Sequence, residues 1–166
     1  MKSLIKKQRE YFLTGTTRSY DFRVEQLKKL RSMLKTYEEE IYHVLKADLN
    51  KSRHEAFTTE IGILYSEIDF TLKHLKDWMK DEEVPAPLTH KGTKSFIRYE
   101  PYGVVLNISP WNYPIQLSLM PAIGAIAAGN TIIIKPSELA IHSSKLINKM
   151  ISTTFDEKFF KVVAGG

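Results

Sequence analysis

Two short apolar segments on either side of an almost wholly apolar helical stretch limit the folds open to this chain. Residues 103–108 and Thr131–Lys135 are both rich in β-branched or leucine side chains, as expected of strands buried on both faces. Between them, Pro114 suits the first turn of a helix, and Gly129 with Asn130 suits its end. A helix that joins two strands of one sheet makes them parallel with a right-handed crossover.

This strand-helix-strand unit predicts both a packing arrangement and a binding edge. The helix has almost no polar face, so we expect a sheet or other helices to cover it, and Pro121 is expected to bend it. Ligands of parallel α/β sheets bind beyond the carboxyl ends of the strands. Those ends carry Ser109, Pro110, Trp111 and Asn112 after the first strand, and Lys135, Pro136, Ser137 and Glu138 after the second.

The rest of the chain is expected to be mostly helical. Helices are predicted over residues 3–13, 21–49 with a break near Tyr37, 52–79 and 143–155, and strands over residues 95–100 and 160–164. Residues 83–88 are interpreted as a linker because prolines interrupt them. The apolar stripe of the 52–79 helix either packs on the chain's own sheet or lies across a neighbouring subunit or domain.

Composition excludes several classes of protein. The chain has 166 residues, 43% hydrophobic and 26% charged, which suits one globular domain. No apolar run approaches the length of a membrane span, and the first residues lack the core of a signal peptide, so a cytoplasmic location is expected. The net charge is +5, but basic and acidic residues are interleaved, which argues against nucleic-acid binding.

The absence of cysteine restricts the chemistry more than any residue present. With a cysteine count of zero, the 166 residues contain no disulfide, no thiolate metal ligand and no cysteine nucleophile. The five histidines show no ligand spacing, so no metal site is expected. Nucleophile-elbow and P-loop patterns are also missing from the sequence.

Three sequence blocks carry a family resemblance. They are PYGVVLNISPWNYP at 101–114, AIAAGN at 125–130 and KPSE at 135–138. In this order and spacing they resemble the aldehyde dehydrogenase superfamily, and the first block is most similar to the class 3 branch. The resemblance covers nearly the whole chain but only the N-terminal minority of a family member.

The resemblance implies an incomplete α/β fold. N-terminal helices in residues 1–84 would pack on the cofactor domain, and residues 85–100 would form a linker and a ribbon strand outside the main sheet. Residues 101–166 would form the first βαβαβ half of a Rossmann-like parallel sheet that binds NAD or NADP. The catalytic domain of the family would be absent.

Asn112 is the candidate catalytic residue. Without the resemblance, the usual role of an asparagine in a proline-flanked turn is to form hydrogen bonds with its own backbone. The resemblance implies instead that its side-chain amide stabilises the negative oxygen formed when a thiolate adds to an aldehyde.

The resemblance also implies a cofactor site. Lys135 and Glu138 would bind the adenosine ribose, where a carboxylate favours NAD over NADP, although class 3 members often accept both. The other groove residues would be Ile108, Ser109, Pro110, Trp111, Ser137 and Gly165, with Gly166 beside it. Plainer interpretations stay open. Lys135 and Glu138 could be ordinary surface residues, and Ser137 with Glu138 could cap the start of a helix. Trp111 could be a core anchor.

The implied activity is NAD(P)-dependent oxidation of an aldehyde to a carboxylic acid. Class 3 likeness implies medium-chain, long-chain or aromatic aldehydes, and a homodimer when full length. Because no catalytic cysteine or glutamate can be assigned, residues 1–166 alone are expected to be inactive. The alternative is a non-catalytic nucleotide-binding or interaction module derived from a truncated aldehyde dehydrogenase.

Overall fold

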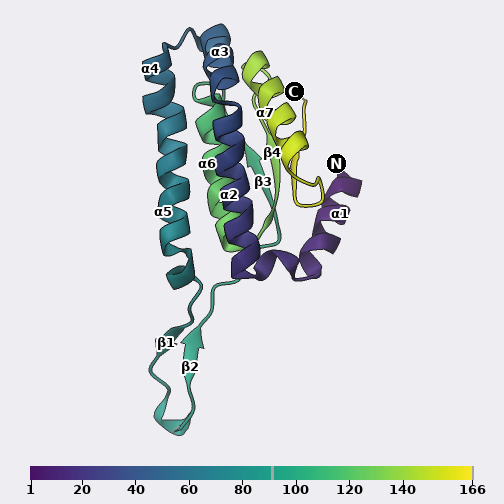
Figure 1. Ribbon diagram of the computed structural model, residues 1–166. Helices are drawn as coiled ribbons and strands as arrows, with labels where there is room; N and C mark the ends of the chain where they lie inside the picture. Colours follow the sequence, from purple (N-terminus) through teal and green to yellow (C-terminus); the bar gives the residue numbers. More distant parts are fainter. Residues whose placement is uncertain (91, 166) are drawn as a thin grey trace.

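The first half of the chain is helical, as predicted. The computed structural model describes residues 1–90 and 92–165, and Figure 1 shows a helical layer packed against a small sheet. The helices before the sheet are α1 (Lys2–Leu13), η1 (Thr16–Arg18), α2 (Tyr20–Thr36), α3 (Glu38–Leu49), α4 (Arg53–Ala56), the π-helix η2 (Phe57–Ile61) and α5 (Gly62–Trp78).

The second half forms the predicted α/β unit. Its elements are β3 (Val104–Ile108), α6 (Pro114–Ala128), β4 (Thr131–Lys135), α7 (Ile141–Thr154) and β5 (Phe160–Val162). The strands lie in the order β3-β4-β5, and both pairings are parallel. The α/β prediction is therefore confirmed, with small shifts at the ends of several elements. Gly166, expected beside Gly165 at the cofactor groove, lies outside the described residues.

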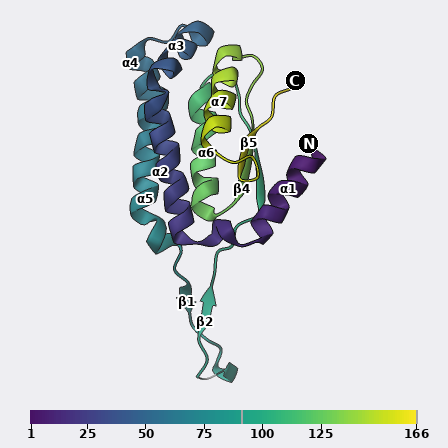
Figure 2. The same cartoon turned by 45° about the vertical axis from the view of Figure 1, so that its right-hand side comes forward.

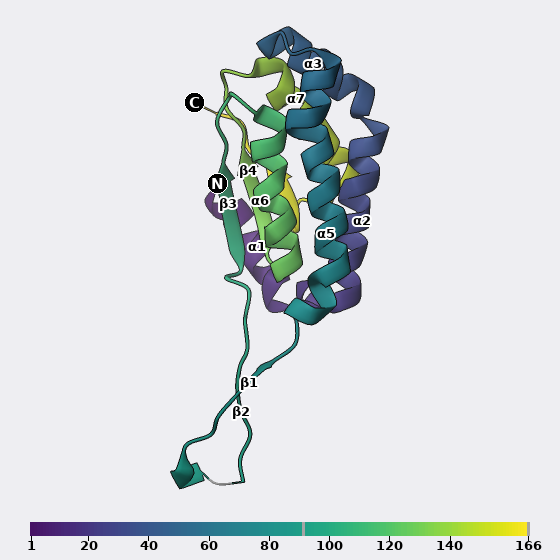
Figure 3. The ribbon, with the colours of Figure 1, turned by 90° about the vertical axis from the view of Figure 1, so that its left-hand side faces the viewer.

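The apolar helix α6 forms the centre of the core. Figure 3 shows it between β3 and β4 on one side and α5 on the other, and α2 also contacts it. Ile115, Leu119 and Ile123 are each 0% exposed. Covering of this helix on several sides, expected from its lack of a polar face, is confirmed.

Pro121 does not end α6, because a side chain from β3 supports the helix there. Proline has no N–H to donate to the carbonyl four residues earlier, which belongs to Leu117. Asn107 Nδ2 donates to the Leu117 carbonyl oxygen at 3.1 Å and to that of Ser118 at 2.9 Å. The single polar residue of β3 thus satisfies a backbone group that the proline leaves unpaired.

The end of α6 joins the helix to the sheet. Gly129 has a φ of 86°, as a left-handed helix cap requires. Asn130 N–H donates to Ala125 O at 2.9 Å, and Asn130 Oδ1 accepts from Gly103 N–H at 2.9 Å. Arg23 Nη1 donates to Ala127 O at 2.9 Å, so a cation lies at the negative end of the helix.

The expectation that the first strand is buried on both faces was wrong. Leu106 and Ile108 are 52% and 66% exposed, whereas Ile132, Ile133 and Ile134 of β4 are buried. Within the described residues β3 lies at the edge of the sheet, and α1 contacts it. Full burial of a strand depends on neighbours that its own sequence does not specify.

The predicted long helix is interrupted by a π-helix. Ser52 caps α4 by accepting from Glu55 N–H at 3.1 Å, as predicted for the start of this segment. The chain then continues through η2 into α5. The stripe that includes Ile61, Leu64 and Ile68 is buried in the chain's own core, which favours the intramolecular interpretation.

A hairpin replaces part of the predicted linker. β1 (Glu82–Val84) pairs antiparallel with β2 (Ser95–Ile97), and η3 (Leu88–His90) lies in the connection. Figure 2 shows this hairpin projecting beyond the ends of the helices. The linker prediction was wrong for β1, because its acidic sequence lacks a strand pattern and depends on pairing with β2. A ribbon outside the main sheet was expected and is present.

The exposed edge strand predicts self-association of residues 1–166. An unpaired apolar edge invites pairing with another chain. We expect oligomers in analytical ultracentrifugation, and we expect Leu106→Lys with Ile108→Lys to shift the protein toward monomer. A clean monomer for the unmodified chain would contradict this expectation.

Candidate functional site

The polar residues predicted at the strand ends meet at one edge of the sheet. Ile108 lies opposite Lys135 in the β3-β4 register, and Ser109 N–H donates to Lys135 O at 3.1 Å. Val163, just after β5, donates its N–H to Ile134 O at 2.9 Å. The carboxyl ends of all three strands therefore lie next to one another.

The loop from β3 to α6 buries one of its predicted site residues and exposes three. Ser109 is 4% exposed, and its Oγ lies 2.6 Å from Ser118 Oγ of α6. Pro110, Trp111 and Asn112 are exposed, and Trp111 is 50% exposed. Trp111 is thus not a core anchor. The Ser109 hydroxyl is already hydrogen-bonded to a side chain of α6.

Asn112 is held through its backbone. Its carbonyl oxygen accepts a hydrogen bond from Lys51 Nζ at 3.2 Å. Its side-chain amide makes no hydrogen bond to any residue in the described part of the chain. The interpretation that this asparagine serves its own turn is therefore not supported by its contacts.

Lys51 and Glu60 form a buried ion pair beneath this loop, and neither residue was predicted to belong to the site. Lys51 Nζ lies 2.6 Å from Glu60 Oε1, with the two side chains 7% and 0% exposed. Glu60 Oε2 accepts from Ile115 N–H at 2.9 Å and from Gln116 N–H at 3.1 Å. Lys51 Nζ also lies 4.0 Å from the centre of the Tyr113 ring.

The sequence contains only a weak signal for this pair. Glu60 directly precedes the buried stripe of a predicted amphipathic helix, where a charged residue is unusual but not diagnostic. Lys51 is one of many lysines in the chain. Their pairing depends on η2, whose single π turn could not be predicted from composition.

Lys135 and Glu138 form an exposed ion pair at the end of β4. Lys135 Nζ donates to Glu138 Oε2 at 3.0 Å. Hydrogen bonds from its own backbone N–H and from Lys135 hold the pKa of Glu138 below its ordinary value, so it is ionised at neutral pH. Ser137 Oγ accepts from Leu139 N–H at 3.2 Å, which makes a short turn before α7.

Gly165 is the last described residue of this edge. Its φ of 143° is one that L side chains rarely adopt, and a Cβ placed there would meet nothing within 4 Å. The position is therefore open to solvent in the part of the chain that the structure describes.

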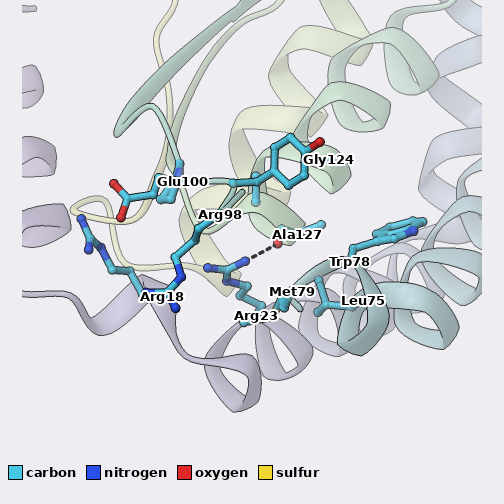
Figure 4. Close-up of a pocket in the computed structure, with 12 residues that line it drawn as sticks. Arg18, Arg23, Leu75, Trp78, Met79, Arg98, Glu100, Gly124 and Ala127 are labelled. Carbon is cyan, nitrogen blue, oxygen red and sulfur yellow. Dashed lines mark hydrogen bonds between the residues drawn. The ribbon is translucent and has the colours of Figure 1, made fainter. Parts of the chain in front are cut away.

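A hollow lies at the other end of the sheet. It has a volume of about 690 Å³, and Pro101, just before β3, and Ala127, at the end of α6, line it. Figure 4 shows Arg18, Arg23 and Arg98 toward one side and Leu75 and Trp78 toward the other. Burial lowers the pKa of Arg23, and the nearby Arg18 lowers it further. This hollow does not contain the predicted site residues.

None of the helices in residues 1–90 and 92–165 is both long and apolar enough to cross a membrane.

Comparisons with known proteins identify relatives over the whole chain. Residues 1–166 match the aldehyde dehydrogenase family. The 4,4'-diaponeurosporen-aldehyde dehydrogenase of Staphylococcus aureus is 49% identical over 156 residues, which are 94% of this chain and 34% of that protein. Aldehyde dehydrogenase family 3 member B1 of Mus musculus is 43% identical over 162 residues, which are 98% of this chain and 35% of that protein.

The structure agrees with these sequence relationships. It superposes on the substrate-bound state of Staphylococcus aureus AldH with a TM-score of 0.97 and 47% identity, covering 99% of this chain and 36% of that one. The chain spans about a third of the length of the relatives it matches. Likeness to a family 3 protein confirms the class 3 prediction. The chain belongs to the aldehyde dehydrogenase family.

Proposed function

We propose that the complete gene product is an NAD(P)-dependent aldehyde dehydrogenase and that this chain supplies its oxyanion donor and part of its cofactor site. The observation that carries the proposal is the state of Asn112. Its backbone is anchored by Lys51, while its side-chain amide is exposed beside the converging strand ends and unbonded within the described residues. An anchored donor with a free N–H suits an oxyanion site.

In this proposal Asn112 acts on the aldehyde oxygen. When a thiolate adds to the carbonyl carbon, the C=O π electrons move to the oxygen, which becomes negative. The Asn112 amide donates a hydrogen bond to that oxygen and lowers the energy of the transition state. The thiolate must come from residues outside this sequence, because the cysteine count here is zero.

Lys135 and Glu138 would bind the cofactor, which accepts hydride from the substrate carbon. The Lys135 ammonium donates hydrogen bonds and the ionised Glu138 carboxylate accepts them, which suits ribose hydroxyls. Ile108, Trp111 and the backbone of Ser109 and Pro110 would line the groove, with Ser137 and Gly165 at its rim. A carboxylate disfavours a 2′-phosphate, so NAD is the first candidate and NADP the second.

The division of the chain follows from these roles. Residues 101–166 are assigned to the first half of the cofactor domain, residues 85–100 to a linker and ribbon, and residues 1–84 to helices that pack on that domain. The substrate class proposed is an apolar aldehyde, because the Staphylococcus aureus relative is named for a diaponeurosporen aldehyde. A homodimer is proposed for the complete protein from the class 3 likeness, and a cytoplasmic location from the sequence pattern.

Replacing Asn112 by alanine in the complete gene product is expected to lower kcat by about 10²–10³-fold, because one oxyanion donor is lost. The measurement is steady-state NADH production from a medium-chain aldehyde. Asn148→Ala, at an exposed position of α7, is the matched control and should leave kcat unchanged. Equal kcat values for the Asn112 variant and the unmodified protein would rule out this role.

Residues 1–166 alone are expected to bind cofactor without turnover. The chain carries Lys135 and Glu138 but no cysteine. Calorimetric titration with NAD tests binding, and an aldehyde assay tests turnover. Binding without turnover is also what the alternative proposal, a non-catalytic nucleotide-binding module, requires, and aldehyde-dependent NADH production by this chain would contradict both.

A further inference from the structure

The loop that carries Asn112 is fastened by residues from a distant part of the chain. Lys51 Nζ contacts three groups: Glu60 Oε1 at 2.6 Å, Asn112 O at 3.2 Å and the Tyr113 ring at 4.0 Å from its centre. Two of these groups belong to Asn112 and its neighbour. One ammonium group therefore connects the loop to the helical layer.

Glu60 fixes the chain just after the same loop. Its second oxygen, Oε2, accepts from Ile115 N–H and Gln116 N–H at the start of α6. These N–H groups have no partner within the helix, and a carboxylate is favoured at this positive end. Lys51 and Glu60 together bond the chain from the Asn112 carbonyl to the first turn of α6.

The helix geometry that brings Glu60 inward is unusual. Glu60 lies in the π-helix η2, in which Glu60 and Ile61 are both 0% exposed. Gly62 follows, and a Cβ there would lie 3.0 Å from Phe57 O. Single π turns inside α-helices are frequent at functional sites.

A simple capping role does not account for this arrangement. Burying two charges costs free energy that a neutral cap such as serine would not require. Lys51 also donates to the Asn112 carbonyl oxygen, which belongs to the loop and not to α6. What it fixes is the backbone from which the Asn112 amide projects.

We propose that Lys51 and Glu60 are positioning residues that hold Asn112 where its amide meets the developing oxyanion. The inference rests on the role of Asn112 in the proposed function. Its test therefore needs one readout that is independent of activity and one that is not.

The independent readout is the mobility of the loop in residues 1–166. In Lys51→Met, the ¹⁵N order parameters of Trp111, Asn112 and Tyr113 are expected to fall from about 0.85 to below about 0.6. Those of β4 should not change, which shows that the fold is intact. Lys51→Arg keeps a charged donor and should restore order.

Lys149→Met is the matched control. Lys149 also pairs with a glutamate, Glu40, at 2.8 Å and lies 5.2 Å from the centre of a tyrosine ring, but on the exposed surface of α7. It should leave the loop ordered. Should Lys51→Met fail to fold, Lys51→Met combined with Glu60→Gln replaces it, because this double variant leaves no buried charge unpaired and keeps an acceptor for the N–H groups of α6.

The second readout is the kinetics of the complete gene product. Lys51→Met is expected to lower kcat on the order of 10²-fold, as a small misplacement of a catalytic group does. Lys51→Arg should recover most of the loss.

Three outcomes separate the two proposals. A loop that stays ordered in Lys51→Met overturns the positioning role, and so does a mobile loop with unchanged kcat. An inactive unmodified gene product overturns the proposed function instead, while the order parameters still show whether Lys51 anchors the loop.

Discussion

Gly129→Ala is expected to lower the free energy of unfolding by about 3 kcal/mol, since strain and overpacking each cost about 1–3 kcal/mol. At its φ of 86° a side chain is strained, and the added Cβ would lie 2.8 Å from Arg23 Nη2 and 2.9 Å from Thr17 O. The Thr17 oxygen belongs to the backbone and has little freedom to move. Arg23 would have to give up its bond to Ala127 or shift with α2.

A glycine inside α6, the helix that Gly129 caps, supplies the control for this variant. Gly124 is helical, and a Cβ placed on it meets nothing within 4 Å. Gly124→Ala should therefore raise stability by up to about 1 kcal/mol, because alanine is the better helix former. Urea unfolding followed by circular dichroism measures both variants. Equal shifts in the two would show that crowding at Arg23 and Thr17 is unimportant.

Glu60→Gln is expected to cost about 3–5 kcal/mol of unfolding free energy, as breaking a buried ion pair does. The neutral amide has one oxygen, which cannot accept both from Lys51 and from the two N–H groups of α6. Lys51 would keep a buried charge opposite an NH₂ group.

The exposed pair of Glu40 and Lys149 provides the comparison. Glu40→Gln removes the same charge from a pair whose side chains are 49% and 53% exposed, and we expect a loss of at most about 1 kcal/mol. Urea unfolding at pH 7 checks both variants. If Glu60→Gln costs no more than Glu40→Gln, the buried pair does not stabilise the fold as described.

The parts of the fold that could be predicted are those with local causes. The bounds of β4 and the start and end of α6 follow from β-branched residues, Pro114 and Gly129, each of which acts within a few residues. The pairing of β1 with β2 could not be predicted, because Glu82 and Glu83 form a strand only when Phe96 and Ile97 lie beside them. The exposure of Leu106 likewise depends on what stands next to β3.

The candidate site also contains residues that local motifs predict and residues that depend on long-range contacts. Asn112, Lys135 and Glu138 were named from short motifs, and the structure brings the ends of β3 and β4 together as the parallel topology requires. Lys51 and Glu60 were missed because their roles come from a π turn and from contacts more than fifty residues away in sequence. Short motifs therefore indicate candidate site residues, whereas the residues that anchor them depend on contacts that are distant in sequence.

Asn107 and Pro121 are a linked pair of irregularities. Each is unfavourable by itself, one a polar side chain in an apolar strand and the other a proline within a helix, yet the amide of Asn107 donates to the carbonyl that Pro121 leaves unpaired. The tolerance of either position to mutation therefore depends on the other. A relative that replaces the proline with a residue bearing an N–H is released from the need for asparagine, so the two positions are expected to change together during evolution.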